Sequence, residues 1–92
     1  MPRIPFSRLP DHARLWVFPA HRPLTAQEEE ELLARVDAFL QGWAAHGTPL
    51  LAGRDWRERR FLLIAVDESS VPPSGCSIDS LVRILKEEGE SL

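Results

Sequence analysis

Residues 61–66 read Phe61-Leu62-Leu63-Ile64-Ala65-Val66, an apolar run without a break. A short apolar run that contains β-branched residues is typical of a strand buried on both faces. We therefore expect this segment to be the central strand of a sheet. It is also the longest apolar run in the chain, and it is far shorter than the roughly 20 residues that a membrane helix needs.

Two more strands are predicted beside it. Arg14-Leu15-Trp16-Val17-Phe18 is apolar on both alternate faces and is followed by Pro19, which closes it. Leu50 to Trp56 and Arg60 to Asp67 form a predicted hairpin, with its turn near Arg57-Glu58-Arg59. This turn has no strong sequence signature, so the register of the hairpin stays open.

The clearest predicted helix begins after Thr25. Thr25 is a good N-cap, and Glu28 three residues later completes a capping box. Gly47 and Pro49 provide the stop, which gives a helix of about 20 residues. One face carries an apolar stripe at helical spacing: Leu32, Val36, Phe39, Leu40 and Trp43.

A second helix is predicted near the end of the chain. Cys76 or Ser77 is its expected cap, and Gly89 its expected end. Its apolar stripe consists of Ile78, Leu81, Val82 and Leu85. The predicted order is thus strand, helix, strand, strand, helix, preceded by an irregular proline-rich arm over residues 1–13.

These elements predict one α+β domain over residues 14–92. A right-handed crossover places the third strand parallel to the first, with the second strand antiparallel on the far side. The expected sheet order is 1-3-2, with both helices on one face. Such a βαββα unit corresponds to a ferredoxin-like split βαβ unit that lacks its last strand.

Composition excludes several classes of protein. The chain has 92 residues, a net charge of −3, one cysteine and three histidines. A single cysteine rules out a disulfide framework within the chain and a cysteine-rich zinc module. The N-terminus lacks the apolar stretch of a signal peptide, so we expect a soluble cytoplasmic protein. We separately expect no metal and no cofactor.

Residues 54–60 interleave arginines with Trp56, a pattern that can grip single-stranded nucleic acid. Asp55 and Glu58 dilute this basic patch, and the net charge of the chain is negative. The pattern therefore favours contact with another protein over nucleic acid.

Several segments together resemble a family of short, uncharacterised bacterial proteins. They are residues 15–18, Thr25 with its acidic run, residues 43–47, Arg60-Phe61 and residues 74–82, so the resemblance spans about residues 14–88. Some relatives carry the label "ABC transporter ATPase". This chain has no G-x-x-x-x-G-K-[ST] loop and only one lysine, so the resemblance implies a bacterial setting and no known activity.

One possible catalytic site is centred on Cys76. A thiol at the start of a helix meets exposed N–H groups, which favour the thiolate. In the predicted topology, His21 after the first strand and Asp67 after the third strand lie at the same edge of the sheet as Cys76. His46 and His12 are expected at the opposite edge. Cys76, His21 and Asp67 are therefore candidate catalytic residues, and a small residue in a tight turn is the alternative role of Cys76.

The same edge is a candidate anion site. Two helix N-termini with free N–H groups favour a phosphate or carboxylate. The residues expected to bind it are Arg22, Thr25, Ser74, Gly75 and Ser77. The alternative is that Thr25 and Ser77 satisfy these donors themselves.

The sequence favours a small non-catalytic protein that works by self-association or by binding a partner. Two helices cover only one face of the predicted sheet, yet its strands are apolar on both faces. Leu15, Val17, Leu62, Ile64 and Val66 alternate with Trp16, Phe18, Phe61, Leu63 and Ala65. We therefore predict a homodimer through the uncovered face. A thiol-dependent enzyme or redox-responsive protein, and a small-anion binder, remain the alternatives.

Overall fold

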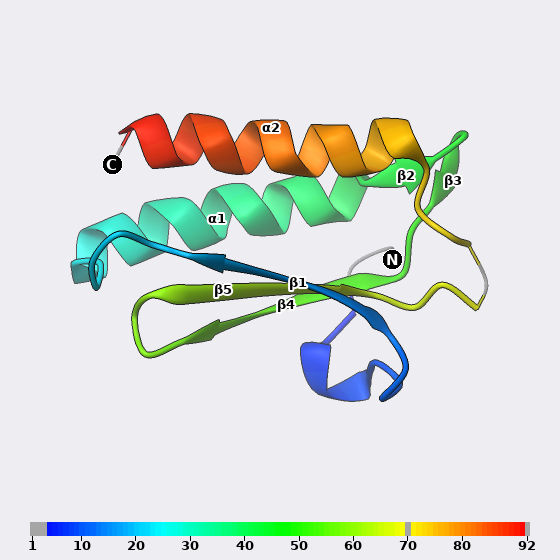
Figure 1. The fold of residues 1–92 in the computed structure, drawn as a ribbon, viewed down its shortest axis with the longest axis horizontal. Helices are drawn as coiled ribbons and strands as arrows, with labels where there is room; N and C mark the ends of the chain where they lie inside the picture. Colours follow the sequence, from blue (N-terminus) through cyan, green and yellow to red (C-terminus); the bar gives the residue numbers. More distant parts are fainter. Residues whose placement is uncertain (1–3, 70, 92) are drawn as a thin grey trace.

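The computed structural model describes residues 4–69 and 71–91. The fold is α+β, with two helices, a three-stranded antiparallel sheet and a small two-stranded sheet (Figure 1). The elements are η1 (Phe6–Arg8), β1 (Arg14–Pro19), α1 (Ala26–Gly42), β2 (Ala44–Ala45), β3 (Thr48–Pro49), β4 (Ala52–Arg57), β5 (Phe61–Val66) and α2 (Gly75–Ser91).

The large sheet has the strand order β1-β5-β4. Its central strand is β5, as the unbroken apolar run predicts. The predicted parallel pairing of the first and third long strands is wrong, because β1 and β5 pair antiparallel, with Leu15 opposite Ala65. The crossover through α1 leads from β1 to β4, and these two strands run in the same direction. The hairpin turn then reverses β5, which fits between them.

The hairpin turn lies where the sequence predicts it. Glu58 and Arg59 have φ values of 56° and 58°, and the Arg60 N–H donates to the Arg57 carbonyl over 3.0 Å. Two consecutive positive φ values are a conformation that hairpin turns usually obtain from Asn-Gly. The absence of that signature explains why the sequence left the register open. The register pairs Trp56 with Leu62.

Helix α1 begins as predicted and ends early. Thr25 accepts from the Glu28 N–H, and Glu28 accepts from the Thr25 N–H, which completes the capping box. The helix stops at Gly42, five residues before the predicted end at Gly47. The intervening chain forms the β2–β3 hairpin, and Gly47 lies in its turn with φ of 80°.

Helix α2 begins at Gly75, two or three residues earlier than a cap at Cys76 or Ser77 predicts. Its cap is Ser74, and neither Cys76 nor Ser77 has that role. The Ser77 N–H donates to Ser74 Oγ over 3.1 Å, and the Ser74 N–H donates to Ser77 Oγ over 2.7 Å. The helix also continues through Gly89 to Ser91, so the predicted end is wrong.

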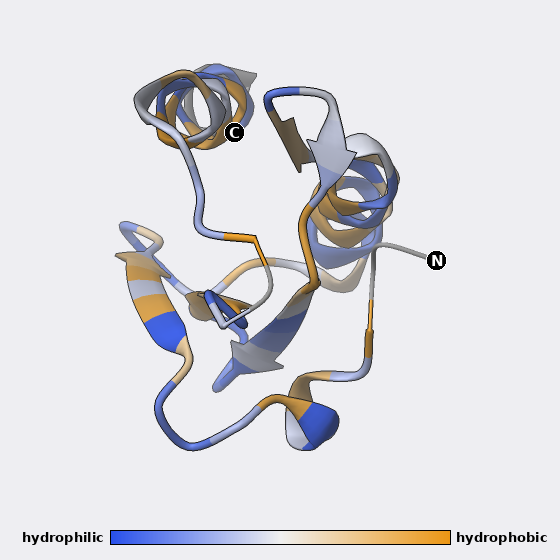
Figure 2. Cartoon of the chain, turned by 90° about the vertical axis from the view of Figure 1, so that its right-hand side faces the viewer, coloured by the Kyte–Doolittle hydropathy of each residue, from blue (hydrophilic) through white to orange (hydrophobic). Residues whose placement is uncertain are grey.

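Both helices lie on one face of the sheet, which we call the inner face (Figures 1 and 2). Seen along the strands, α1 lies over the β4 side and α2 over the β1 side (Figure 2). The core between these layers contains Leu32, Val36, Leu40, Trp43, Leu62, Ile64, Val66 and Leu81, all buried. The Trp43 indole N–H donates to the Ser77 carbonyl over 2.8 Å, which joins the end of α1 to the start of α2.

The arm before β1 packs on the opposite face, which we call the outer face (Figure 2). The Ile4 N–H donates to the Ala52 carbonyl over 2.8 Å, and the chain then turns through η1. A Cβ atom at Gly53 would overlap the Ile4 carbonyl oxygen and lie 3.2 Å from the Phe6 Cα atom. Glycine is therefore required in β4 where the arm crosses it.

Candidate functional site

The register decides which side chains line the outer face. Leu15 pairs with Ala65, and Val17 pairs with Leu63. Opposite residues in a sheet point to the same face. The outer face therefore combines Leu15 and Val17 with Phe61, Leu63 and Ala65, and the predicted grouping with Leu62, Ile64 and Val66 is wrong. That grouping required a register in which Leu15 and Val17 lie opposite Leu62, Ile64 or Val66.

The arm covers only part of the outer face. Leu63 and Ala65 are 8% and 3% exposed, whereas Leu15 and Val17 are 49% and 52% exposed. Leu15 and Val17 both lie on β1, the strand at one edge of the sheet. We call these two residues the β1 patch. The apolar surface that the sequence assigns to a whole sheet face is thus concentrated on a single edge strand.

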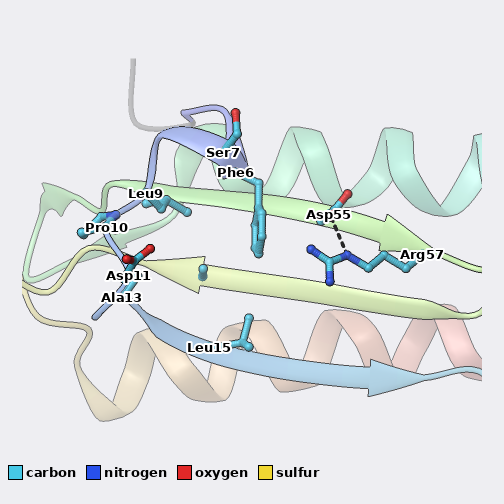
Figure 3. A pocket seen from close by; sticks show the side chains of 10 residues that line it. Phe6, Ser7, Leu9, Pro10, Asp11, Ala13, Leu15, Asp55 and Arg57 are labelled. Atoms are coloured by element: carbon cyan, nitrogen blue, oxygen red, sulfur yellow. Dashed lines mark hydrogen bonds and ion pairs between the residues drawn. The ribbon is translucent and has the colours of Figure 1, made fainter.

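An open hollow of about 620 Å³ lies between the arm and the sheet (Figure 3). Its apolar lining includes Phe6, Leu9 and Leu15. Its charged groups are Asp55 and Arg57, which form an ion pair at 2.8 Å. The hydrogen bond from Arg57 lowers the pKa of the Asp55 carboxyl. The hollow therefore offers apolar contacts and a charge pair that is already neutralised.

The structure does not bring the predicted catalytic residues together. His21 follows β1 and lies near the start of α1, while Cys76 lies in the first turn of α2, beside the end of α1. A helix of 17 residues is about 25 Å long. Cys76 and His21 therefore lie at opposite ends of the molecule. The antiparallel pairing of β1 and β5 causes this separation.

Asp67 lies at the Cys76 end of the sheet, after β5. Its carboxylate accepts from the Ser69 N–H and from the Ser69 hydroxyl, and these bonds lower the pKa of Asp67. The charge of His12 adds to this shift, so His12 lies at the same end, contrary to the prediction. His46, in the β2–β3 turn, also lies at this end, because β2 contacts α2. The exposed Cys76 thiol is therefore without its predicted base.

The two halves of the predicted anion site are separated in the same way. At the start of α1, Arg22 donates to both Glu28 oxygens over 2.7 and 2.6 Å, and Thr25 is engaged in the capping box. At the start of α2, Ser74 and Ser77 bind each other, and Gly75 lies between them in the chain. Arg22 and one helical N–H at each helix start, that of Glu28 and that of Ser77, are thus engaged within the chain, as the alternative interpretation expects of such donors.

The arginines of the β4–β5 hairpin are also engaged. Arg54 donates to both oxygens of Asp37 on α1 over 2.8 and 2.9 Å. Arg59 donates to Glu29 over 2.8 Å, and the Trp56 indole donates to the same carboxylate. These contacts anchor the hairpin to α1. The sequence analysis did not predict these contacts, because the hairpin and the helix are distant in the chain.

Other kinds of site receive no support within residues 4–69 and 71–91. No cluster of three or more histidine, cysteine or acidic side chains is placed to hold a metal ion there. Neither helix in that part of the chain is long and apolar enough to cross a bilayer. Comparison with known proteins finds no matching family model, curated protein or solved structure.

Proposed function

We propose that this protein is non-catalytic and works by self-association, with the β1 patch as its contact surface. The observation that carries the proposal is the half-exposure of Leu15 and Val17 beside an otherwise covered outer face. Apolar side chains grouped next to a hollow are typical of interaction sites. The alternative chemistries lack support because Cys76 is far from His21 and the helix N-termini are capped from within.

The setting we propose is the bacterial cytoplasm. The resemblance over residues 14–88 and the single unpaired cysteine support it. The fold we propose for the βαββα unit is a ferredoxin-like arrangement without its last strand. The position of β5 between β1 and β4, with the crossover helix on one face, supports that assignment.

Sedimentation equilibrium across 1–500 micromolar protein tests the proposal. We expect a reversible dimer that is weakened when Leu15→Thr and Val17→Thr are combined. Threonine is β-branched and favours strands, so it keeps the strand preference of β1 while it adds a polar group. The matched control is Glu30→Gln, on the exposed face of α1. A monomeric mass over the whole range would overturn self-association and point to a different protein as the partner.

A further inference from the structure

The hydrogen-bonding pattern of β5 shows which backbone groups of β1 face outward. The Ala20 N–H donates to the Arg60 carbonyl over 2.8 Å, in register with the β1–β5 ladder. Bonded and non-bonded pairs alternate along an antiparallel ladder. Trp16 and Phe18 therefore bond to β5, and the N–H and C=O groups of Leu15 and Val17 point to the free edge. These outward groups have no partner within the described part of the chain.

The other edge of the sheet is partly covered. The Asp67 N–H donates to the Leu51 carbonyl over 2.9 Å, so the backbone groups of Ala52, Arg54 and Trp56 in β4 point outward. The Ala52 carbonyl accepts from the Ile4 N–H. The Trp56 N–H donates to the Asp55 carboxylate over 2.9 Å. Within the described residues, the chain thus engages outward groups near both ends of β4, and none of the outward groups of Leu15 and Val17 on β1.

From this contrast, and resting on the proposed function, we infer that β1 pairs antiparallel with β1 of a second copy. The two three-stranded sheets then form one continuous sheet across a twofold axis that passes beside Trp16. Unprotected edge strands are templates for such pairing. From Leu15 to Phe18, β1 has no charge, proline or bulge that would oppose it.

The register centred on Trp16 satisfies every outward group of the β1 patch, whereas with Leu15 opposite Leu15 the Val17 carbonyl would face Ala13, whose N–H already donates to the Pro10 carbonyl. With Trp16 opposite Trp16 of the second copy, Leu15 lies opposite Val17 of that copy, and each such pair exchanges two hydrogen bonds. All four outward groups of each strand are then bonded. With Val17 opposite Val17, Leu15 would face Pro19, which has no N–H, and the Leu15 carbonyl would stay unpaired. The first register is therefore favoured.

Side chains fit the same register. On the outer face, Leu15 of each copy contacts Val17 of the other, which joins the two β1 patches into one apolar surface. On the inner face, the half-buried Trp16 rings approach each other. Trp16 already packs against Trp43 with ring centroids 6.1 Å apart, so its position is set by the core.

Helix α2 extends the contact above the sheet. Its Glu87 pairs with Arg35 of α1 at 3.6 Å, and its Leu81 is fully buried in the core. At 100° per residue, Val82 lies on the flank of α2 away from α1. Because α2 lies over the β1 side of the sheet, this flank of the helix faces outward on the same side as the free edge of β1 (Figure 2). Val82 is 48% exposed and would meet α2 of the second copy.

The area is sufficient for a reversible dimer. A 17-residue helix gives the contact a length of about 25 Å, and one helix layer above one sheet layer gives a height of roughly 20 Å. The product is about 500 Å² on each copy, or roughly 1,000 Å² in total, which is the lower limit of a specific interface. We therefore expect dissociation in the micromolar range.

Proline and alanine at position 17 test the inference. Val17→Pro removes the outward N–H, which β5 does not use, so the fold should persist with unchanged circular dichroism. Val17→Ala removes most of the side chain and keeps the N–H. Because a dimer loses two hydrogen bonds in the proline variant, we expect it to dissociate at least about tenfold more readily than the alanine variant. Trp16→Pro, which also breaks the β5 ladder, should lose the fold.

The outcomes separate the two proposals. A wild-type monomer overturns the proposed function and this inference together. A wild-type dimer that the two Val17 variants weaken equally keeps self-association and overturns the edge pairing in favour of face-to-face contact. A Val17→Pro variant that fails to fold is replaced by the cross-linking measurement below, which needs no proline.

Cross-linking tests the register directly. In a Cys76→Ser background, a tagged Leu15→Cys chain is mixed with an untagged Val17→Cys chain and oxidised gently. Paired residues in this ladder have Cα atoms about 5.5 Å apart, which a disulfide spans. We expect the mixed disulfide to exceed both like pairs. A predominance of Val17→Cys pairs would overturn the register centred on Trp16.

Discussion

Ile4 and Gly53 lie backbone against backbone where the arm crosses β4. The space at Gly53 that a Cβ atom would fill is taken by the Ile4 carbonyl oxygen, and Phe6 backbone atoms lie 3.2 Å away. Because these neighbours are backbone atoms, they cannot rotate aside as a side chain can. The arm and the sheet are therefore fitted to each other at this crossing.

Gly53→Ala should destabilise the protein by about 1–3 kcal/mol, because the arm must shift away from β4. Urea unfolding gives the free energy, and amide exchange at Ile4 reports release of the arm. The matched control is Gly42→Ala, where nothing lies within 4 Å of the new methyl group. Equal stability of the two variants would contradict the close crossing.

The ion pair between Arg54 and Asp37 joins β4 to α1. Both side chains are largely shielded, at 21% and 28% exposure, and two hydrogen bonds link them. Asp37→Asn leaves the Arg54 charge without its anion and should cost about 1–3 kcal/mol in unfolding free energy. Glu68→Gln, at the exposed 3.4 Å pair with Arg14, should cost less than about 0.5 kcal/mol. A reversed order of these two costs would refute this assignment.

Glu28 makes stability depend on pH. The Arg22 guanidinium and the Thr25 N–H bind its carboxylate and lower its pKa from 4.5 to about 2. A lowered pKa in the folded state stabilises the fold above the unfolded value and loses that effect as the pH falls toward 2. Glu28→Gln should therefore be less stable than wild type at pH 7, and the difference should shrink as the pH falls through the folded pKa of about 2.

Urea unfolding of both proteins at pH 7, 4 and 2 checks this dependence. Glu30→Gln is the control, since it removes a charge from the same helical turn outside the capping box. A difference between wild type and Glu28→Gln that stays constant from pH 7 to pH 2 would exclude the proposed linkage.

Cys76 should react as an exposed thiol without help from His21. Iodoacetamide should label it in the folded protein, and His21→Ala should leave the rate unchanged, because the imidazole lies at the other end of α1. Cys76→Ser should fold normally, since Ser74 and Ser77 cap the helix without the thiol. Mass spectrometry follows the alkylation. Slower labelling in His21→Ala would restore the thiol-based hypothesis.

Local signals in the sequence predicted the elements well. The capping box at Thr25 and the apolar run at residues 61–66 depend on neighbours in the chain, and both are present in the structure. The direction of β5 relative to β1 depends on how the hairpin folds back, and composition does not encode it. That single error moved His21 and Cys76 to one edge and created the candidate site.

The contacts that anchor the β4–β5 hairpin to α1 could not be predicted from the sequence, for a different reason. Arg54 and Asp37 each look like an ordinary surface charge, and only the packing of α1 on β4 brings them together. Gly53 did carry a signal, because glycine inside a strand often marks a close backbone approach. Its meaning becomes clear only once the arm is seen to cross there.

The bond from Ile4 to Ala52 also bears on how far the proposed self-association could extend. A sheet with two open edges gains a neighbour on each side, and a ribbon of copies then grows without an end. In the proposed pairing, β1 is used when two molecules meet, and the arm hinders further addition at the part of β4 that it covers. We therefore expect a chain whose arm no longer contacts β4 to be more prone to fibre formation.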